Sequence, residues 1–239
     1  MSLLAPPRRF DPDAPELVDR PGTDETLVRE ELRLLEDTNR RFGGHSLMLH
    51  YTRRFLNSVP AHTWSILDLG TGSADIPRAV ANWFRRSGRA VRITAVDRHP
   101  GVLRLAEESC VSWPEIQLEQ HDLRALPHKT GSYDLVLCSL ALHHFTSADA
   151  VTILRRMQEI ARLGYIVNDL RRNWASIWMT HLLASTVIRS RIFRQDAPQS
   201  CRAAFTIREL RTMAKQAGLQ NFRIKRHQMG FRMVLEGRK

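Results

Sequence analysis

The sequence predicts an α/β protein built around a doubly wound, mostly parallel sheet of seven strands. From about residue 64 onwards, short apolar runs alternate with segments of helical periodicity, which is typical of parallel sheets. The run Tyr133–Ser139 is apolar along almost its whole length, as expected of a strand covered on both faces. A Gly-x-Gly turn, Gly70-Thr71-Gly72, follows the first run directly. Its glycines can adopt positive φ and leave bare backbone at a strand's carboxyl end, where doubly wound sheets bind ligands.

The 239 residues are long enough to form one sizeable core, with additions before it. Residues 1–22 carry five prolines and scattered charges, which indicates a flexible or surface-wrapping arm. Two helices are expected next, over about 23–40 and 46–57, because apolar residues recur there at helical spacing. We therefore interpret residues 23–60 as N-terminal helices that form a lid or cap, and residues 61–239 as the α/β domain.

The α/β domain is expected to alternate between strands and helices. Its strands are predicted over about 65–69, 91–96, 116–120, 133–139, 164–167, 221–226 and 231–235. Helices are predicted between the first five strands, over about 75–86, 100–109 and 147–161. The bulky apolar segment from Arg171 to about Phe193 predicts one or two helices, within a lid insertion over about 172–205. A further helix is expected to begin after Thr206, since Thr-Ile-Arg-Glu fits a capping box.

The charge of the chain is strongly basic. It has 36 Lys and Arg against 25 Asp and Glu, a net charge of +11 at pH 7. This charge favours anionic partners, namely nucleic acid, a membrane surface or acidic small molecules; a basic surface with no specific partner is an equal alternative. The cysteines Cys110, Cys138 and Cys201 lie far apart, so no zinc or redox motif and no metal are expected. An odd number of cysteines, with no export signal or membrane-spanning run, predicts a cytoplasmic protein.

Two kinds of cofactor compete for the glycine turn. A dinucleotide fingerprint needs a small residue at the last position of its G-x-G-x-x-G pattern, so that helix and strand pack closely. That position holds Asp75, whose carboxylate would repel a pyrophosphate at the helix N-terminus. S-adenosylmethionine (SAM) has no pyrophosphate and carries an ammonium group, for which Asp68 at the end of the first strand is a suitable partner.

The stretch around the glycine turn resembles the first motif of class I SAM-dependent methyltransferases, with Asp68, Gly70 and Gly72 as the acidic-x-Gly-x-Gly core. Three further segments match this family in order, each at a strand end. Asp97 matches the acidic residue that binds the ribose hydroxyls, and His121-Asp122-Leu123 matches the segment beside the adenine. Tyr133–Ser139, followed by Leu142-His143-His144-Phe145, matches the fourth-strand motif, whose end faces methionine and substrate.

The resemblance implies the Rossmann-like fold of this family, SAM as the cofactor and no metal. It implies a cofactor site formed by Asp68, Gly70, Thr71, Gly72, Asp97, Arg98, Asp122, Leu123 and Ser139. His143 and His144 are candidate catalytic bases, because they follow the fourth strand and a histidine can accept a proton near neutral pH. Alternatively, either histidine hydrogen-bonds a loop or lines the cofactor pocket.

Candidate substrate-binding residues lie on the other wall of the same crevice and in the lid. They are Arg40, Asn168, Asp169, Arg171 and Trp178. Asp169 and Arg171 could instead cap the next helix and pair with each other. The segments 39–44 and 167–172 resemble a bacterial subgroup of small-molecule methyltransferases, related to the ubiquinone/menaquinone-type enzymes and often linked to polyketide or quinone tailoring.

This resemblance implies methyl transfer to a small aromatic, quinone-like or polyketide-like acceptor. O-methylation is favoured over C-methylation because a histidine base suits a phenol or an enol. The basic charge leaves an RNA methyltransferase or RNA-binding protein as the alternative, although no Asn-Pro-Pro-Tyr-like motif follows the fourth strand. A non-catalytic SAM-fold partner protein is a third interpretation. Arg189, Arg191 and Arg194 beside the apolar lid also allow peripheral contact with an anionic membrane.

Overall fold

The computed structural model describes residues 5–14, 16, 20, 22–56, 63–186, 191–227 and 230–239, with the backbone alone for residues 183–186 and 191–192. The boundary predicted between residues 60 and 61 lies outside the described residues. So do two prolines of the predicted arm, Pro15 and Pro21, and Arg189 of the lid.

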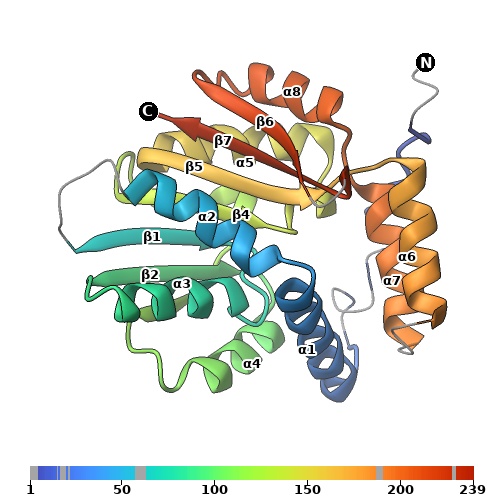
Figure 1. Cartoon of the computed structure of the whole chain (residues 1–239), viewed down its shortest axis with the longest axis horizontal. Helices are drawn as coiled ribbons and strands as arrows, with labels where there is room; N and C mark the ends of the chain where they lie inside the picture. Colours follow the sequence, from blue (N-terminus) through green and yellow to red (C-terminus); the bar gives the residue numbers. More distant parts are fainter. Residues whose placement is uncertain are drawn as a thin grey trace.

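A seven-stranded sheet with the order β3-β2-β1-β4-β5-β7-β6 forms the centre of the molecule (Figure 1). The strands are β1 (Trp64–Leu69), β2 (Val91–Asp97), β3 (Ile116–Gln120), β4 (Tyr133–Ser139), β5 (Ala161–Leu170), β6 (Phe222–His227) and β7 (Arg232–Arg238). The first five pair in parallel, whereas β7 runs antiparallel to both β5 and β6. The predicted doubly wound, mostly parallel sheet of seven strands is thus confirmed.

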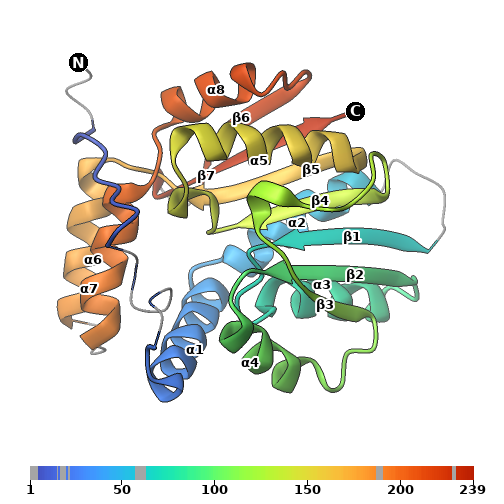
Figure 2. The ribbon, with the colours of Figure 1, turned by 180° about the vertical axis from the view of Figure 1, so that it is seen from behind.

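Eight α-helices among the described residues surround this sheet. They are α1 (Glu25–Arg41), α2 (Gly44–Leu56), α3 (Asp75–Arg86), α4 (Pro100–Cys110), α5 (Ser147–Ile160), α6 (Trp174–Thr186), α7 (Arg191–Ala203) and α8 (Ile207–Gln216). Helices α2 and α3 cover the face turned to the viewer in Figure 1, and α5 and α8 cover the face seen in Figure 2. Helices α1, α6 and α7 lie beyond the carboxyl ends of the parallel strands.

The alternation of side chains along the strands divides the core into two halves. In β1, Ile66 packs with α2 and α3, whereas Leu67 and Leu69 pack with α5 and α8. All three side chains are buried, as expected of a central strand with helices on both faces. Because β1, β2 and β4 run in parallel, their last residues lie at the same edge of the sheet, where the glycine turn begins.

Two differences from the predicted elements concern the region beyond this edge. Strand β5 continues to Leu170, so Asn168 and Asp169 lie within a strand rather than after it, where β5 pairs with both β4 and β7. The lid has a complete second helix, α7, although Pro198 lies inside it and its sequence is mostly polar. The prediction that helical structure ends near Phe193 was therefore wrong. The capping box predicted at Thr206 is confirmed, with Glu209 as its partner.

The N-terminal arm wraps the lid. The Arg8 guanidinium donates hydrogen bonds to the carbonyl oxygens of Ala203 at 2.6 Å and Phe145 at 2.8 Å. The backbone N–H of Arg9 donates to the carbonyl oxygen of Arg202 at 3.0 Å. Buried Arg172 donates to the carbonyl oxygen of Pro6 at 2.8 Å. These contacts place the described part of the arm along α7 (Figure 2), as expected of a surface-wrapping segment.

Candidate functional site

A cavity of about 490 Å³ lies at the carboxyl edge of the sheet. Its walls come from the glycine turn after β1, the ends of β2 and β4, and the arm and lid helices α1, α6 and α7. Eight of the nine predicted cofactor residues line it, and so do both predicted catalytic histidines. The exception is Asp122, which caps a short 3-10 helix and pairs with Arg124 at 2.5 Å. Its neighbour Leu123 lines the cavity instead.

The glycine turn adopts the positive φ angles that the sequence predicts. Gly70 has φ of 68° and Gly72 has φ of 55°. The backbone N–H groups of Gly70 and Thr71 both donate to the carbonyl oxygen of Val96, at 2.9 and 3.0 Å, which ties the turn to the end of β2. A Cβ atom on Gly70 would lie 2.5 Å from the Cβ of Ala141, so only glycine fits there.

Asp97 joins the end of β2 to the glycine turn. Its carboxylate accepts the backbone N–H of Gly72 at 3.0 Å through one oxygen and that of His99 at 3.1 Å through the other. Each carboxylate oxygen has a second lone pair. Asp97 can therefore accept two hydroxyl donors from a ligand while the turn holds it in place.

Asp68 is a buried carboxyl in the cavity wall. Only 2% of its surface is exposed, and its Oδ1 atom has no hydrogen-bond partner among the described residues. Burial, together with the nearby carboxylates of Asp75 and Asp97, raises the pKa of Asp68 to about 7. A buried carboxyl with an unused oxygen suits a cationic ligand group, since a cation would favour the ionised form.

Asp75, at the last position of the G-x-G-x-x-G pattern, connects helices α1, α2 and α3. Asp75 accepts a hydrogen bond from the Nδ2 of Asn39 at 2.9 Å and lies 2.8 Å from the Nε2 of His45. Although its burial acts in the opposite direction, these contacts hold the pKa of Asp75 below its ordinary value. Arg232 donates to the other side of the Asn39 amide at 2.9 Å. Asp75 thus anchors α1 and α2 to the start of α3.

His143 and Asp169 form a buried pair at the end of β4. A 3-10 helix, Leu142–His144, turns the His143 ring towards the end of β5. The Nδ1–H of His143 donates to one oxygen of Asp169 at 2.7 Å, and the His143 backbone N–H donates to the other at 3.0 Å. Both side chains are at most 4% exposed. Because a carboxylate only accepts, this contact places the proton on Nδ1 and leaves Nε2 as the reactive nitrogen.

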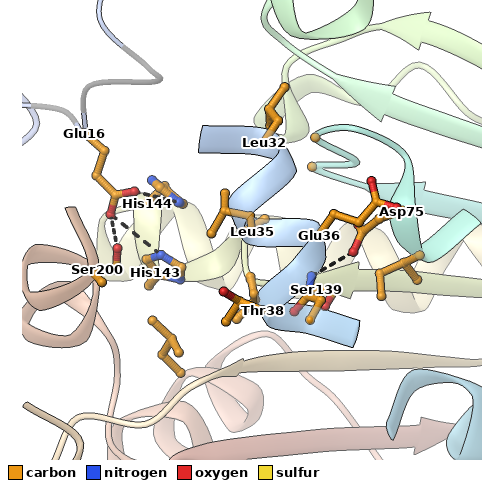
Figure 3. A pocket seen from close by; sticks show the side chains of 18 of the residues that line it. Glu16, Leu32, Leu35, Glu36, Thr38, Asp75, Ser139, His143, His144 and Ser200 are labelled. Carbon is orange, nitrogen blue, oxygen red and sulfur yellow. Dashed lines mark hydrogen bonds and ion pairs between the residues drawn. The ribbon is translucent and has the colours of Figure 1, made fainter. Parts of the chain in front are cut away.

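The arm brings a second carboxylate to the opposite side of the two histidines (Figure 3). Oxygens of Glu16 lie 3.9 Å from the Nε2 of His143 and 3.9 Å from the Nε2 of His144. Ser200 of α7 donates its hydroxyl to Glu16 at 2.5 Å and so orients it. The three ligand atoms of Glu16, His143 and His144 lie within 4.8 Å of one another, close enough for a cation to lie between them.

The predicted substrate-binding residues are placed differently. None of the five is among the described residues that line the cavity. Arg40 is exposed and pairs with Asp37, and Trp178 is 74% exposed on the outer face of α6. Arg171 donates to the carbonyl oxygen of Gly230 at 3.1 Å and Asp169 pairs with His143, so the alternative in which Asp169 and Arg171 pair with each other is not the one observed. Asn168 donates to the Ser139 hydroxyl at 3.0 Å behind the cavity wall.

Several residues of the arm, the lid, the first helix and β7 line the cavity but were not predicted from the sequence. They include Glu16, Leu32, Leu35, Asn39, Met179, Phe193, Ser200 and Arg232. The helical spacing of Leu32 and Leu35 was a usable signal, because it places both on one face of α1. Nothing local marked Glu16 or Ser200, whose contact joins residues 184 positions apart.

Comparisons with known proteins agree on the type of domain. Residues 66–164 match the family described as "Methyltransferase domain". A malonyl-[acyl-carrier protein] O-methyltransferase of Halorhodospira halophila is 28% identical over 132 residues, which cover 51% of this chain and 43% of that protein. The chain therefore matches less than half the length of this curated relative.

Two solved structures share the fold. The plantazolicin methyltransferase in complex with SAH has a TM-score of 0.67 at 14% identity, covering 88% of this chain and 90% of that one. A putative O-methyltransferase from Nostoc punctiforme has a TM-score of 0.66 at 18% identity, covering 95% of this chain and 63% of that one. The family match spans the glycine turn, Asp97 and His143, and thus most of the cavity floor.

Proposed function

We propose that this chain, whose domain match and fold are those of a class I SAM-dependent methyltransferase, transfers a methyl group from SAM to a small apolar acceptor, with O-methylation favoured. This proposal rests on one observation. A single cavity contains acceptor groups for a cation and for two hydroxyls, here called the cradle, beside the buried pair of His143 and Asp169. A malonyl-[acyl-carrier protein] O-methyltransferase among the relatives supports an oxygen acceptor, although the two chains match over only part of their lengths.

The cradle fits SAM on the chemistry of its donors and acceptors. Asp68 would hold the ammonium, because it is buried with an unused oxygen. Asp97 would accept both ribose hydroxyls, and Leu123 would pack beside the adenine. The positive-φ glycines keep the floor free of side chains. When bound there, SAM supplies a methyl group on a sulfonium, which is already activated for displacement.

The remaining lining supports a small apolar acceptor. Apolar side chains converge from α1, α6 and α7, namely Leu35, Met179 and Phe193. Such a mostly apolar lining suits a small apolar molecule. An RNA strand would instead need an open basic groove reaching the same histidines. The apolar lining therefore favours a small acceptor over RNA as the substrate.

His143 would act as the general base. Its Nδ1–H is held by Asp169, so Nε2 is free to accept the proton of an acceptor hydroxyl as the oxygen attacks. The resulting imidazolium would lie between two carboxylates, Asp169 at 2.7 Å and Glu16 at 3.9 Å, which stabilise its positive charge. A C-methylation would use the same nitrogen to remove a proton from a phenol or enol whose ring carbon is the nucleophile.

The Asp97→Ala variant tests the cofactor site. We expect it to weaken SAM binding by about tenfold to a hundredfold, because two charge-assisted hydrogen bonds are lost. Calorimetric titration with SAM measures the effect. Asp37→Ala, which removes an exposed carboxylate of α1, is the matched control and should leave the affinity unchanged. Failure of the wild-type chain to bind SAM would refute the proposed function.

The acceptor class is tested by incubating the chain with methyl-labelled SAM and a fractionated cell extract. We expect the label to enter small lipophilic material. Label in RNA or protein would refute the small-molecule proposal and favour the RNA methyltransferase alternative. Saponification releases the label from a methyl ester, and cleavage with hydriodic acid releases it from a methyl ether. A carbon–methyl bond resists both treatments, so the two together separate O- from C-methylation.

Asp68 should make SAM binding depend on pH. Its pKa is about 7 in the free protein, and the ammonium of SAM requires the ionised carboxylate. Affinity should therefore fall by up to about tenfold for each pH unit below 7. Calorimetry across this range should show a much flatter dependence for Asp68→Asn than for the wild type. An equal slope in both proteins would contradict the role assigned to Asp68.

The same raised pKa affects the stability of the free protein. The fold disfavours the charged form of Asp68. The contribution of protonated Asp68 to the free energy of unfolding is therefore fully present below the ordinary pKa of 3.8 and is lost as the pH rises through a pKa of about 7. Without SAM, Asp68→Asn should thus be more stable than the wild type above pH 7. Thermal unfolding at several pH values measures this difference.

A further inference from the structure

The outer face of α6 is an exposed apolar ridge. Trp174, Trp178 and Leu182 follow one another at a spacing of four residues, so they lie on one side of the helix. Their surfaces are 52%, 74% and 54% exposed, respectively. Two exposed tryptophans one helical turn apart are unusual on a surface that faces water, because each presents a large apolar ring to the solvent.

The opposite face of the same helix lines the cavity. Ser176, Met179 and Thr180 contribute to its wall, and Ile177 is buried. Helix α6 alone therefore separates the ridge from the proposed acceptor site. Figure 1 shows α6 and α7 projecting beyond the carboxyl edge of the sheet, with α6 running alongside α7.

The two lid helices carry more positive than negative charge. Residues 174–203 include four arginines and a single acidic residue, Asp196. Asp196 is 1% exposed, whereas Arg194 is exposed. The ridge helix Trp174–Thr186 itself has no charged residue. An anionic surface approaching this side would therefore meet positive charge and apolar rings, with no exposed carboxylate from these two helices.

We propose that the α6 ridge docks the protein onto an anionic lipid surface, so that a lipophilic acceptor enters the cavity behind it from the membrane. Tryptophan favours the boundary between water and lipid, since its ring is apolar and its N–H remains hydrated. The exposed Arg194 of the neighbouring helix α7 adds electrostatic attraction to anionic headgroups. Only the lipophilic nature of the acceptor rests on the proposed function; the docking surface is carried by α6 and α7.

A protein partner or a second copy of the chain fits the ridge less well. A stable interface buries roughly 800 Å² on each partner. Three side chains, even if fully covered, present less apolar area than that, because a tryptophan contributes only about 150–250 Å². A lipid surface needs no complementary shape, and an apolar side chain can enter it individually.

The experiment measures binding of the full chain to vesicles, with neither SAM nor acceptor present. Vesicles of phosphatidylcholine alone and of phosphatidylcholine with phosphatidylglycerol are sedimented with the protein. We expect binding to the anionic vesicles that weakens as salt is raised, because headgroup charge is screened. The double variant Trp174→Ser/Trp178→Ser should lose about tenfold or more of this binding, in line with the apolar area removed.

Val111→Ser is the matched control, since Val111 is 83% exposed at the end of α4, away from the lid. It should bind vesicles as the wild type does. Unchanged SAM affinity would show that the double variant is folded. If it is not folded, quenching of wild-type tryptophan emission by brominated acyl chains provides a second readout, because Trp64 is buried and Trp83 and Trp113 are half-buried against the core around α3.

Equal binding of the double variant and the wild type, or no binding of the wild type, would overturn the docking surface. A concentration-dependent dimer that the double variant loses, without vesicle binding, would assign the ridge to a second copy and overturn it too. SAM binding and methyl transfer to a soluble acceptor are measured separately. Failure of vesicle binding therefore leaves the proposed function standing, and loss of SAM binding leaves the docking surface standing.

Discussion

His143→Gln should lower the rate of methyl transfer by about a hundredfold to ten-thousandfold while leaving SAM affinity within about twofold. Glutamine has a similar size and can still donate to Asp169, so the wall of the cavity keeps its shape. It has no nitrogen that accepts a proton near neutral pH, so the acceptor hydroxyl would stay protonated. Single-turnover rates with saturating SAM measure the loss, and calorimetry measures the affinity.

Asp169→Asn separates orientation from proton acceptance. The side-chain amide can donate to Nδ1, which would move the histidine proton to Nε2 and remove the reactive lone pair from the cavity. We expect a slower rate and an altered pH–rate profile, which a merely structural role of Asp169 would not produce. His50→Gln, at an exposed histidine of α2, is the control. Full turnover in His143→Gln with normal SAM affinity would exclude His143 as the base.

The half of the cavity that we propose for SAM could be located from the sequence because its residues are placed by local features of the chain. Each lies within a few positions of a strand end, and parallel strands end at the same edge of the sheet. Asp68, Gly70 and Asp97 therefore converge wherever the strands are correctly identified. Gly70 and Gly72 also carry a conformational signal, since positive φ is what a glycine turn permits.

The acceptor half could not be predicted in this way, because it is assembled from segments far apart in the chain. Glu16 reaches His143 and Ser200 only after the arm has wrapped α7. The prolines and charges of the arm predicted a flexible or surface-wrapping segment but not its partners, Ala203 and Phe145, to which Arg8 donates. Such contacts leave no periodic pattern in the sequence, so a pattern-based analysis has nothing to detect.

Trp178 and Asp169 illustrate two further limits. An apolar residue in a lid suggests a buried contact, but the helical phase of α6 turns Trp178 outward and Met179 inward. Strand β5 gives no turn signal at its expected end, and pairing with β7 extends it through Asp169. The carboxylate is then directed at His143 rather than at Arg171. In both places tertiary packing, not local sequence, decides the direction of a side chain.

The second large effect is expected at the glycine turn, where Gly70→Ala should be far more damaging than Gly88→Ala. Both glycines have similar positive φ, 68° and 65°, so alanine costs about 1–2 kcal/mol of backbone strain at either position. They differ in surroundings. A Cβ on Gly88 meets nothing within 4 Å, whereas a Cβ on Gly70 would lie 2.5 Å from the Cβ of Ala141.

Neither neighbour of Gly70 can move easily. Ala141 precedes the helical turn that carries His143, and the Gly70 N–H is fixed to Val96 at 2.9 Å. Gly70→Ala should therefore lose about 2–5 kcal/mol of unfolding free energy, from strain and overpacking together. It should also weaken SAM binding, because the turn and Asp97 share the Gly72 contact. Denaturant unfolding and SAM calorimetry of both variants measure these effects. Equal losses of unfolding free energy in Gly70→Ala and Gly88→Ala would show that the close approach to Ala141 contributes nothing to the cost.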